Sequence, residues 1–476
     1  MSTRTSGAAR PKTPSRRAFR RRPPSAGEGR FAVPAMEGMT VRAASAIEEG
    51  RDRAAQRNGG YGEPRELTRT DPRTGLAQTL WLPEGFDFQV LSPAGSRMDD
   101  GAAVPLGHDA MACFAAGEPG VWHLVRNHEE RSGPGAAAPS GRAEGRYDPL
   151  GGGGTTTMRL RWERGAPVLE GAWQSLAGTI ANCAGGPTPW GSWLSCEETT
   201  AGAGAGWGAE HGYVFEVPSG AAREADPVPL RAMGRFVHEA VAVDPGTGVV
   251  YETEDQHTAG FYRFLPETPG ALAEGGRLQM LKVKGEWNYD TRTGQRTKKA
   301  LPVEWVDIAD PDPADAERVP LAVFNQGWAR GAAVFGRLEG CWWGGGAVYL
   351  ASSSGGEESA GQVWEYAPGS GSLRLVFESP DAELLSSPDG IAVSPGGNLL
   401  LCENARRGLP AVRGLTRAGE VFTFAHHEGG AEWRGATFSP GGEVLFVNLQ
   451  GATAGDPALQ PGRTIAVWGP WDRGVL

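Results

Sequence analysis

Carboxylates and cysteines recur at two kinds of position in this sequence, and both residue types bind metal ions. The first kind of position is the start of a short apolar segment, where the sequence has Asp109, Cys183, Glu239, Glu339, Asp389 and Arg434. The second kind follows the next apolar segment and holds Asn127-His128-Glu129, Glu197-Glu198, Glu254-Asp255 and Glu403-Asn404. Many oxygen ligands suit calcium, whereas a thiolate among them favours a softer transition ion such as iron. The pattern therefore indicates a site for several cations.

A repeated unit sets the spacing of these residues. Three clear copies span residues 239–251, 389–401 and 434–446, and each contains two strand-like segments joined by Pro-Gly, which favours a tight turn. Weaker copies begin at Asp109, Cys183 and Glu339, which makes six. A third strand-like segment recurs at 212–218, 260–266, 361–368 and 419–424. Repeats of roughly 50 residues built from short strands are typical of propeller blades, so the sequence predicts an all-β, six-bladed β-propeller.

The ends of the chain are expected to differ from its body. Residues 1–60 are rich in Arg, Ala, Pro and Gly without any period, which predicts a disordered tail or a degenerate export signal. Residues 61–476 should form the propeller. The segments 85–90 and 464–468 resemble strands left at the two ends, and we expect them to complete one blade together, because closure removes exposed strand edges.

The propeller prediction brings the polar residues together. In such a fold, the segment before the innermost strand and the segment after the second strand lie at the same mouth of the channel. Carboxylates crowded there would repel one another by several kcal/mol unless cations neutralised them. The alternative is that each acid is a separate rim residue that pairs with a nearby Arg or with solvent. The coincidence across the units favours metal binding.

Charge and hydropathy exclude several classes of partner. The net charge is −10, and the longest basic run lies in the N-terminal tail, so we expect no nucleic-acid partner. No apolar stretch of about 18 residues is present, so we expect no membrane span. Ser15-Arg16-Arg17-Ala18-Phe19 resembles a twin-arginine signal, but no apolar stretch follows it. The protein should be periplasmic or secreted if this signal works and cytoplasmic otherwise, and we expect a monomer.

Several longer motifs resemble the PhoX family of alkaline phosphatases. They are Asn127-His-Glu129, Gly153-Gly-Thr-Thr-Thr157, Asn182-Cys-Ala-Gly-Gly-Pro-Thr-Pro-Trp-Gly191, Cys196-Glu-Glu198, His238-Glu-Ala-Val241 and a Trp-Glu-Tyr strand. The resemblance covers the chain from about residue 60 to the C-terminus. It implies a propeller with a cluster of calcium and iron in its channel, hydrolysis of small-molecule phosphate monoesters at alkaline pH, and twin-arginine export.

The resemblance and the repeat together give candidate roles. Cys196, Glu197 and Glu198 are candidate ligands from the Cys-Glu-Glu motif, and Cys183 competes with Cys196 for iron. The repeat adds Asp109, Glu129, Glu239, Glu254, Asp389 and Glu403 as metal ligands. Arg337-Leu-Glu339 resembles the Arg-x-Glu pattern of the family, so we expect Arg337 and Glu339 to be catalytic. Substrate should contact Arg337, Asn127 and Asn182.

Two other functions are compatible with the same features. A calcium-dependent lactonase would also use a six-bladed propeller, with Asn127, Asn182 and Asn404 among its ligands. A non-catalytic propeller could keep its metals for structure alone. Iron bound beside calcium would argue against the lactonase, since one calcium is sufficient for lactone opening.

Overall fold

The computed structural model describes residues 58–137, 141–405, 408–454 and 461–476. These residues all lie in one compact unit, Glu49–Leu476. Most of the predicted tail, with the twin-arginine-like motif at 15–19, lies outside the described residues. In the described part, α2 (Ala322–Trp328) is the one α-helix, and none of its helices is long and apolar enough to cross a membrane.

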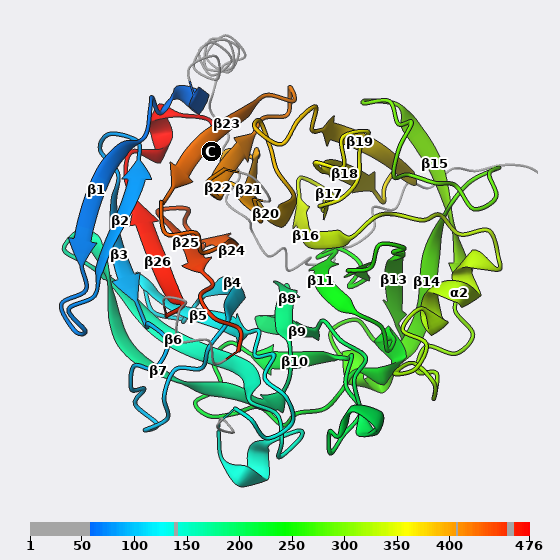
Figure 1. Cartoon of the computed structure of the whole chain (residues 1–476), viewed down its shortest axis with the longest axis horizontal. Helices are drawn as coiled ribbons and strands as arrows, with labels where there is room; N and C mark the ends of the chain where they lie inside the picture. Colours follow the sequence, from blue (N-terminus) through cyan, green and yellow to red (C-terminus); the bar gives the residue numbers. More distant parts are fainter. Residues whose placement is uncertain (1–57, 138–140, 406–407, 455–460) are drawn as a thin grey trace, which may run out of the picture. The chain divides into compact units, whose positions relative to one another are not determined.

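The described residues form antiparallel sheets arranged around a common centre (Figure 1). One sheet contains β4 (His108–Ala115), β5 (Val121–His128), β6 (Gly153–Glu163) and β7 (Ala166–Thr179). The next contains β8 (Asn182–Pro187), β9 (Ser192–Glu197) and β10 (Val214–Pro218). Another contains β24 (Trp433–Phe438), β25 (Val444–Leu449), β26 (Arg463–Trp468) and β3 (Asp87–Leu91).

The two remaining sheets are larger. One contains β20 (Pro388–Val393), β21 (Leu399–Glu403), β22 (Ala411–Leu415), β23 (Val421–His426), β2 (Ala77–Leu82) and β1 (Arg65–Thr70). The other begins with β11 (His238–Val243), β12 (Val250–Glu254), β13 (Phe261–Pro266), β14 (Gly276–Val283) and β15 (Ala300–Asp307). It continues through β19 (Ser372–Glu378), β18 (Gln362–Ala367), β17 (Ala347–Ser352) and β16 (Leu338–Gly344). The short pairing of β15 with β19 joins its two halves.

The innermost strands form a closed ring. In chain order they are β4, β8, β11, β16, β20 and β24, each packs against the next, and β24 packs against β4 (Figure 1). Apolar side chains fill the space between neighbouring sheets, for example Phe88, Leu400, Trp433 and Val467. The ring brings one end of every innermost strand to a common centre.

Both ends of the described chain contribute strands to the ring. As predicted from the segments 85–90 and 464–468, β3 pairs with β26 in an antiparallel register. The sequence analysis did not predict β1 and β2, which extend the sheet of β20–β23 through the pair Trp81 and His426. The rings of these two residues are stacked, with their centroids 5.0 Å apart.

A β-bulge recurs at the start of every innermost strand. The register between the first and second strand of each unit shifts between His108 and Met111, Asn182 and Gly185, His238 and Val241, Leu338 and Cys341, Pro388 and Ile391, and Arg434 and Thr437. A bulge inserts an extra residue and changes the direction of a side chain. In each unit the bulge includes or directly adjoins the polar residue singled out in the sequence.

Candidate metal centre

The bulges place six residues at the same end of the ring of inner strands. We call Asp109, Cys183, Glu239, Glu339, Asp389 and Arg434 the inner-strand residues, and none is more than 8% exposed. A recurring backbone hydrogen bond brings a second residue beside each of them. The amides of Glu129, Glu198, Asp255, Ser353, Asn404 and Gln450 donate to the carbonyls of Gly107, Ala181, Val237, Arg337, Ser387 and Glu432. These six donors, the loop residues, follow the second strand of each unit.

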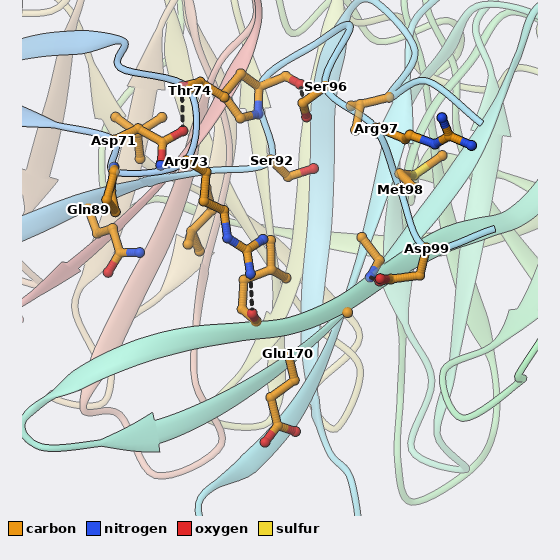
Figure 2. A pocket seen from close by; sticks show the side chains of 18 residues that line it. Asp71, Arg73, Thr74, Gln89, Ser92, Ser96, Arg97, Met98, Asp99 and Glu170 are labelled. Atoms are coloured by element: carbon orange, nitrogen blue, oxygen red, sulfur yellow. Dashed lines mark hydrogen bonds between the residues drawn. The ribbon is translucent and has the colours of Figure 1, made fainter. Parts of the chain in front are cut away.

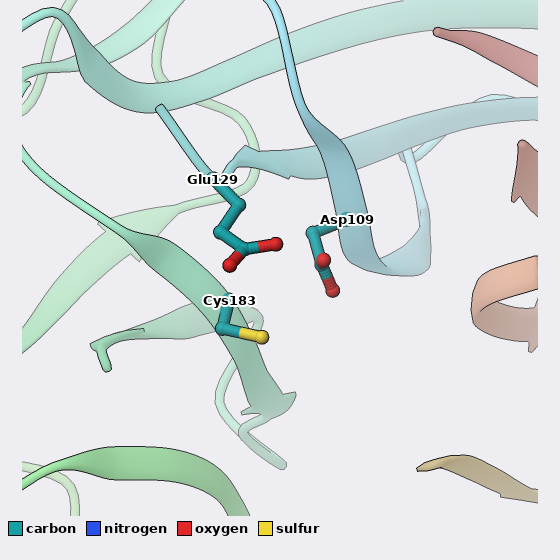
Figure 3. A group of neighbouring side chains, drawn as sticks. All are labelled: Asp109, Glu129 and Cys183. Carbon is teal, nitrogen blue, oxygen red and sulfur yellow. The ribbon is translucent and has the colours of Figure 1, made fainter. Parts of the chain in front are cut away.

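The inner-strand and loop residues form three groups whose ligand atoms lie within 4.8 Å of one another. The groups are Asp109 with Glu129 and Cys183, Cys183 with Glu198 and Glu239, and Glu239 with Glu339 and Asp389. Figure 3 shows the first group, in which side chains from β4, β8 and the segment after β5 face one space. Because Cys183 and Glu239 each belong to two groups, the three groups form one continuous cluster.

The cluster lacks enough protein donors for its negative charge. Burial first, and the neighbouring Glu198 next, raise the pKa of Glu239 well above its usual value, and burial followed by Asp389 does the same for Glu339. Burial raises the pKa of Asp389 to about 6. The Oε2 atom of Glu239 is buried without a hydrogen-bond partner among the described residues. Cations among these oxygens would supply the missing partners, so the donor set fits a cluster of several metal ions.

Arg337 borders the cluster next to Glu339. Its Nε and Nη2 atoms donate to Oδ1 and Oδ2 of Asp255 at 2.8 and 2.6 Å, and Nη2 lies 3.2 Å from Oε1 of Glu339. Ser353 also donates to Oε1 of Glu339, at 2.6 Å. The hydrogen bonds to Asp255 raise the pKa of Arg337, so the guanidinium stays charged. The sequence analysis expected this arginine beside a metal-binding carboxylate.

Two further arginines contact the cluster. Arg434 takes the inner-strand position of its unit, where it donates to Asp389 and lies 3.8 Å from Asp109. Arg131 donates through Nε to Glu129 and through Nη2 to Glu198, and its side chain is 37% exposed. Arg131 therefore bridges two groups of the cluster on the side that faces solvent.

The chain beneath the cluster is tightly packed. Every inner-strand residue is followed by a small one, and these residues are Ala110, Ala184, Ala240, Gly340, Gly390 and Gly435. A Cβ atom added to Gly435 would lie 2.5 Å from Cα of Ala110, and one added to Gly340 would lie 2.7 Å from the carbonyl oxygen of Asp389. We call this ring of small residues the neck. On the other side of the cluster, the Arg131 and Arg337 side chains are partly exposed.

Comparison with known proteins identifies the family. The profile of the family described as alkaline phosphatase PhoX matches residues 68–453. The chain belongs to the PhoX family. This confirms the resemblance found in the sequence and its consequence, a metal-dependent phosphatase. The comparison with curated protein sequences gives no match.

A solved structure shares the fold of this PhoX family member. Pseudomonas fluorescens PhoX, solved in complex with vanadate as a transition state analogue, aligns with a TM-score of 0.65 and 18% identity, covering 87% of this chain and 98% of that one. A gluconolactonase from Xanthomonas campestris aligns with a TM-score of only 0.35 and 13% identity, covering 80% of this chain and all of that one. The first comparison supports an all-β propeller fold for the chain.

Three carboxylates predicted as metal ligands, one from the Cys-Glu-Glu motif and two from the repeat, accept hydrogen bonds from neighbouring loops. Glu197, Glu254 and Glu403 end the second strands of their units, and we call them the capping carboxylates. Glu197 accepts hydrogen bonds from the amides of Ile180, Gly212 and Tyr213 and from His211. Glu254 accepts from Gly260 and Tyr262, and Glu403 from Ser386 and Ala411. Our proposed ligand set leaves them out, because they precede the loop residues by one position and face the other side of the strand.

The two candidate cysteines have different surroundings. Cys183 belongs to two groups of the cluster, and its thiol lies 3.4 Å from Oε1 of Glu239. Cys196 is buried in the apolar cluster that includes Leu194, Val214 and Val241. The structure places Cys183, and not Cys196, among the other candidate ligands, so our proposed ligand set takes Cys183.

The two asparagines expected to bind substrate are committed to the scaffold. Asn127 donates to the carbonyls of Cys183 and Ala184 and accepts from Trp193 and Ser195. Asn182 donates to Ser195, and its Oδ1 accepts from Thr179. Both are fully buried. Asn127 thus holds the backbone of Cys183 in place, and we leave both residues out of the proposed substrate contacts.

The sequence patterns gave no role to two residues that contact the cluster. Asp255 stands in the loop position equivalent to Glu198, and it anchors Arg337. The repeat could have identified Asp255, because Asp255 follows Glu254 as Glu198 follows Glu197. Arg131 follows Glu129 by two positions and lies outside the repeat, so no periodic signal could have identified it.

Proposed function

We propose that this protein hydrolyses phosphate monoesters with calcium and iron ions bound at the centre of a six-bladed propeller. The observation that carries the proposal is the sharing of Cys183 and Glu239 between groups, which extends one cluster over three groups of ligand atoms. A single ion would need only one of these groups. Membership of the PhoX family supports phosphate chemistry at this cluster.

The donor types suggest how the ions divide. A thiolate prefers iron to calcium, so we assign iron to the two groups that contain Cys183. The third group, Glu239 with Glu339 and Asp389, offers only carboxylate oxygens, which suit calcium. When bound, such ions polarise phosphate oxygens and lower the pKa of coordinated water. The full proposed ligand set is Asp109, Glu129, Cys183, Glu198, Glu239, Glu339 and Asp389.

Arg337 and Arg131 are suited to bind the phosphate group. Each is held by two of its nitrogens on carboxylates of the cluster, and the Nη1 atom of each takes part in no bond to the described residues. A guanidinium held in this way is already oriented, so little entropy is lost when phosphate binds. The positive charge of Arg337 would also stabilise the additional negative charge of the transition state, whereas Arg131 would contribute to binding the substrate. Glu339 acts by fixing Arg337 and by binding metal.

Location and assembly rest on the sequence. We propose a periplasmic or secreted location if the segment at 15–19 acts as a twin-arginine signal and a cytoplasmic one otherwise, and a monomeric protein without nucleic-acid or membrane partners. Fractionation of the native host and size-exclusion chromatography test these two points.

The function is tested with purified, untagged protein. We expect elemental analysis to find calcium and iron together, and we expect turnover of p-nitrophenyl phosphate at alkaline pH that is lost on chelation and restored by adding both ions. Bis(p-nitrophenyl) phosphate tests monoester specificity, and a lactone substrate tests the alternative hydrolase. Protein that contains both metals but turns over no phosphate monoester would refute the proposal.

A further inference from the structure

A cavity of about 360 Å³ lies away from the metal cluster. It is enclosed by the segment 71–74, strand β3, the segment 92–104 and strand β7 (Figure 2). None of its lining residues belongs to the three groups of the cluster. Its wall combines apolar side chains, including Met98, Val104 and Leu169, with a few polar ones. A small organic molecule would fit such a space.

A buried positive charge stands behind one wall of this cavity. Arg126 is fully buried, and no carboxylate among the described residues forms an ion pair with it. Its guanidinium donates to the carbonyl and the hydroxyl of Ser92 at 3.2 and 3.1 Å and to Thr156 and Thr464. Its Nε atom has no hydrogen-bond partner in the described part of the chain. A buried cation without a counterion costs several kcal/mol, so a nearby anion would stabilise it.

Ser92 connects this charge to the cavity. It lines the cavity, and its Oγ atom accepts a hydrogen bond from Arg126, which leaves the hydroxyl proton for another acceptor. Its φ angle of 45° is rare for a residue other than glycine, and strained backbone of this kind is frequent at binding sites. Figure 2 shows Ser92 in the lining of the cavity, whereas the Arg73 guanidinium already donates to the carbonyl of Leu169.

The acids of the cavity wall are already engaged. Asp71 accepts from the amide of Arg73 and from Thr74, and Asp99 accepts from the amide of Ala172. Glu170 forms ion pairs with Arg159 and Arg161. These acids would repel a phosphate dianion more strongly than a monoanion. Arg97, also in the lining, is exposed and makes no side-chain bond to the described residues.

We propose that this cavity binds a small organic carboxylate with a short apolar chain. The Ser92 hydroxyl donates to the carboxylate, with Arg126 behind it and Arg97 at the rim, and the apolar lining packs the chain. The cavity shares no residue with the three groups of the metal cluster.

Isothermal titration calorimetry of the full chain with hexanoate tests the proposal, with hexanol as the uncharged probe. We expect hexanoate to bind at one site, hexanol to bind at least tenfold more weakly, and Ser92→Ala to weaken hexanoate roughly tenfold by removing the donor. Ser96→Ala is the matched control. Ser96 also lines the cavity, but its hydroxyl donates to the carbonyl of Pro93, so its loss should leave hexanoate binding unchanged.

A second variant guards against misfolding of Ser92→Ala. Arg97 is exposed, so Arg97→Gln should fold normally, weaken hexanoate about threefold and leave hexanol unaffected. Saturating hexanoate should not change phosphatase turnover. The proposal is overturned if hexanoate does not bind the native protein, if it binds no better than hexanol, or if Arg97→Gln and a folded Ser92→Ala both bind it as the native protein does.

Discussion

The capping carboxylates and the cluster carboxylates stand side by side in the sequence, yet their surroundings are opposite. Glu197 receives hydrogen bonds from three backbone amides and from His211, all of which belong to neighbouring loops. Glu198, the next residue, turns to the centre and meets Arg131 and other acids. Glu239 likewise keeps one oxygen without a protein partner. Glu197 and Glu239 thus differ in the number of their protein donors, although the capping Glu254 also has one buried oxygen, Oε1, without a partner among the described residues.

The largest expected effect is on the cluster side of this comparison. Glu239→Gln removes a ligand that belongs to two groups while keeping the side-chain volume. We expect most of the bound metal to be lost and kcat/KM to fall on the order of 10³-fold. Elemental analysis and p-nitrophenyl phosphate turnover measure both. Glu252→Gln is the matched control, because Glu252 is equally buried but lies in none of the groups, and metal retention by both variants would contradict the assignment.

Substitution of a capping carboxylate should instead reduce the stability of the fold and leave metal binding unchanged. Glu197→Ala leaves three backbone amides and His211 without their acceptor, so the free energy of unfolding should fall by about 3 kcal/mol. Metal content per folded chain should not change. Denaturant unfolding gives the stability, with the exposed Glu163→Ala as reference. Loss of metal from folded Glu197→Ala protein would place Glu197 among the ligands after all.

Arg337 tests whether the cluster needs an oriented cation for phosphate. Arg337→Met should lower kcat/KM about 100-fold, because it removes a guanidinium that would stabilise the transition state. Arg374→Met provides the control, since Arg374 donates through its Nη2 atom to both oxygens of Glu365, which belongs to none of the three groups. Equal activity of the two variants would exclude Arg337 from catalysis.

The acidic cluster should make stability depend on pH when the metals are chelated. Burial raises the pKa of Asp389 from 3.8 to about 6, so the folded chain holds this proton more tightly than the unfolded chain does. The contribution of this group to stability is therefore greatest below about pH 4 and is lost as the pH rises through about 6, a loss of roughly 3 kcal/mol. Thermal unfolding in EDTA measures the fall, and Asp389→Asn should flatten it. A profile that rises over this interval would show that the acids have other partners.

The smallest effect is expected at the rim. Arg131→Gln should raise KM for p-nitrophenyl phosphate about tenfold and weaken inhibition by inorganic phosphate to the same degree, with little change in kcat. Arg142→Gln is the control, since Arg142 pairs with Glu224 on the surface. An unchanged KM would restrict Arg131 to pairing with Glu129 and Glu198.

The repeat predicted the fold class and the inner-strand residues because both depend on a period that the sequence displays. Asp109, Cys183, Glu239, Glu339 and Asp389 fall at equivalent positions, and the bulge then turns them to one centre. The sequence could not show which of the neighbours Glu197 and Glu198 is a ligand. Side chains alternate along a strand, so the exact end of β9 decides which of the two faces the centre. Arg131 and the Cys196 environment depend on contacts between units, which no local pattern encodes.

The neck determines how far apart the metals can stand. Backbones that approach closely at Gly435 and Ala110, and at Gly340 and Asp389, set the diameter of the ring from which the inner-strand ligands project. Residues without any reactive group therefore determine the spacing of the reactive ones. Enlarging a single one, as in Gly340→Ala, would push adjacent ligands outward and alter which ions fit, without touching a ligand.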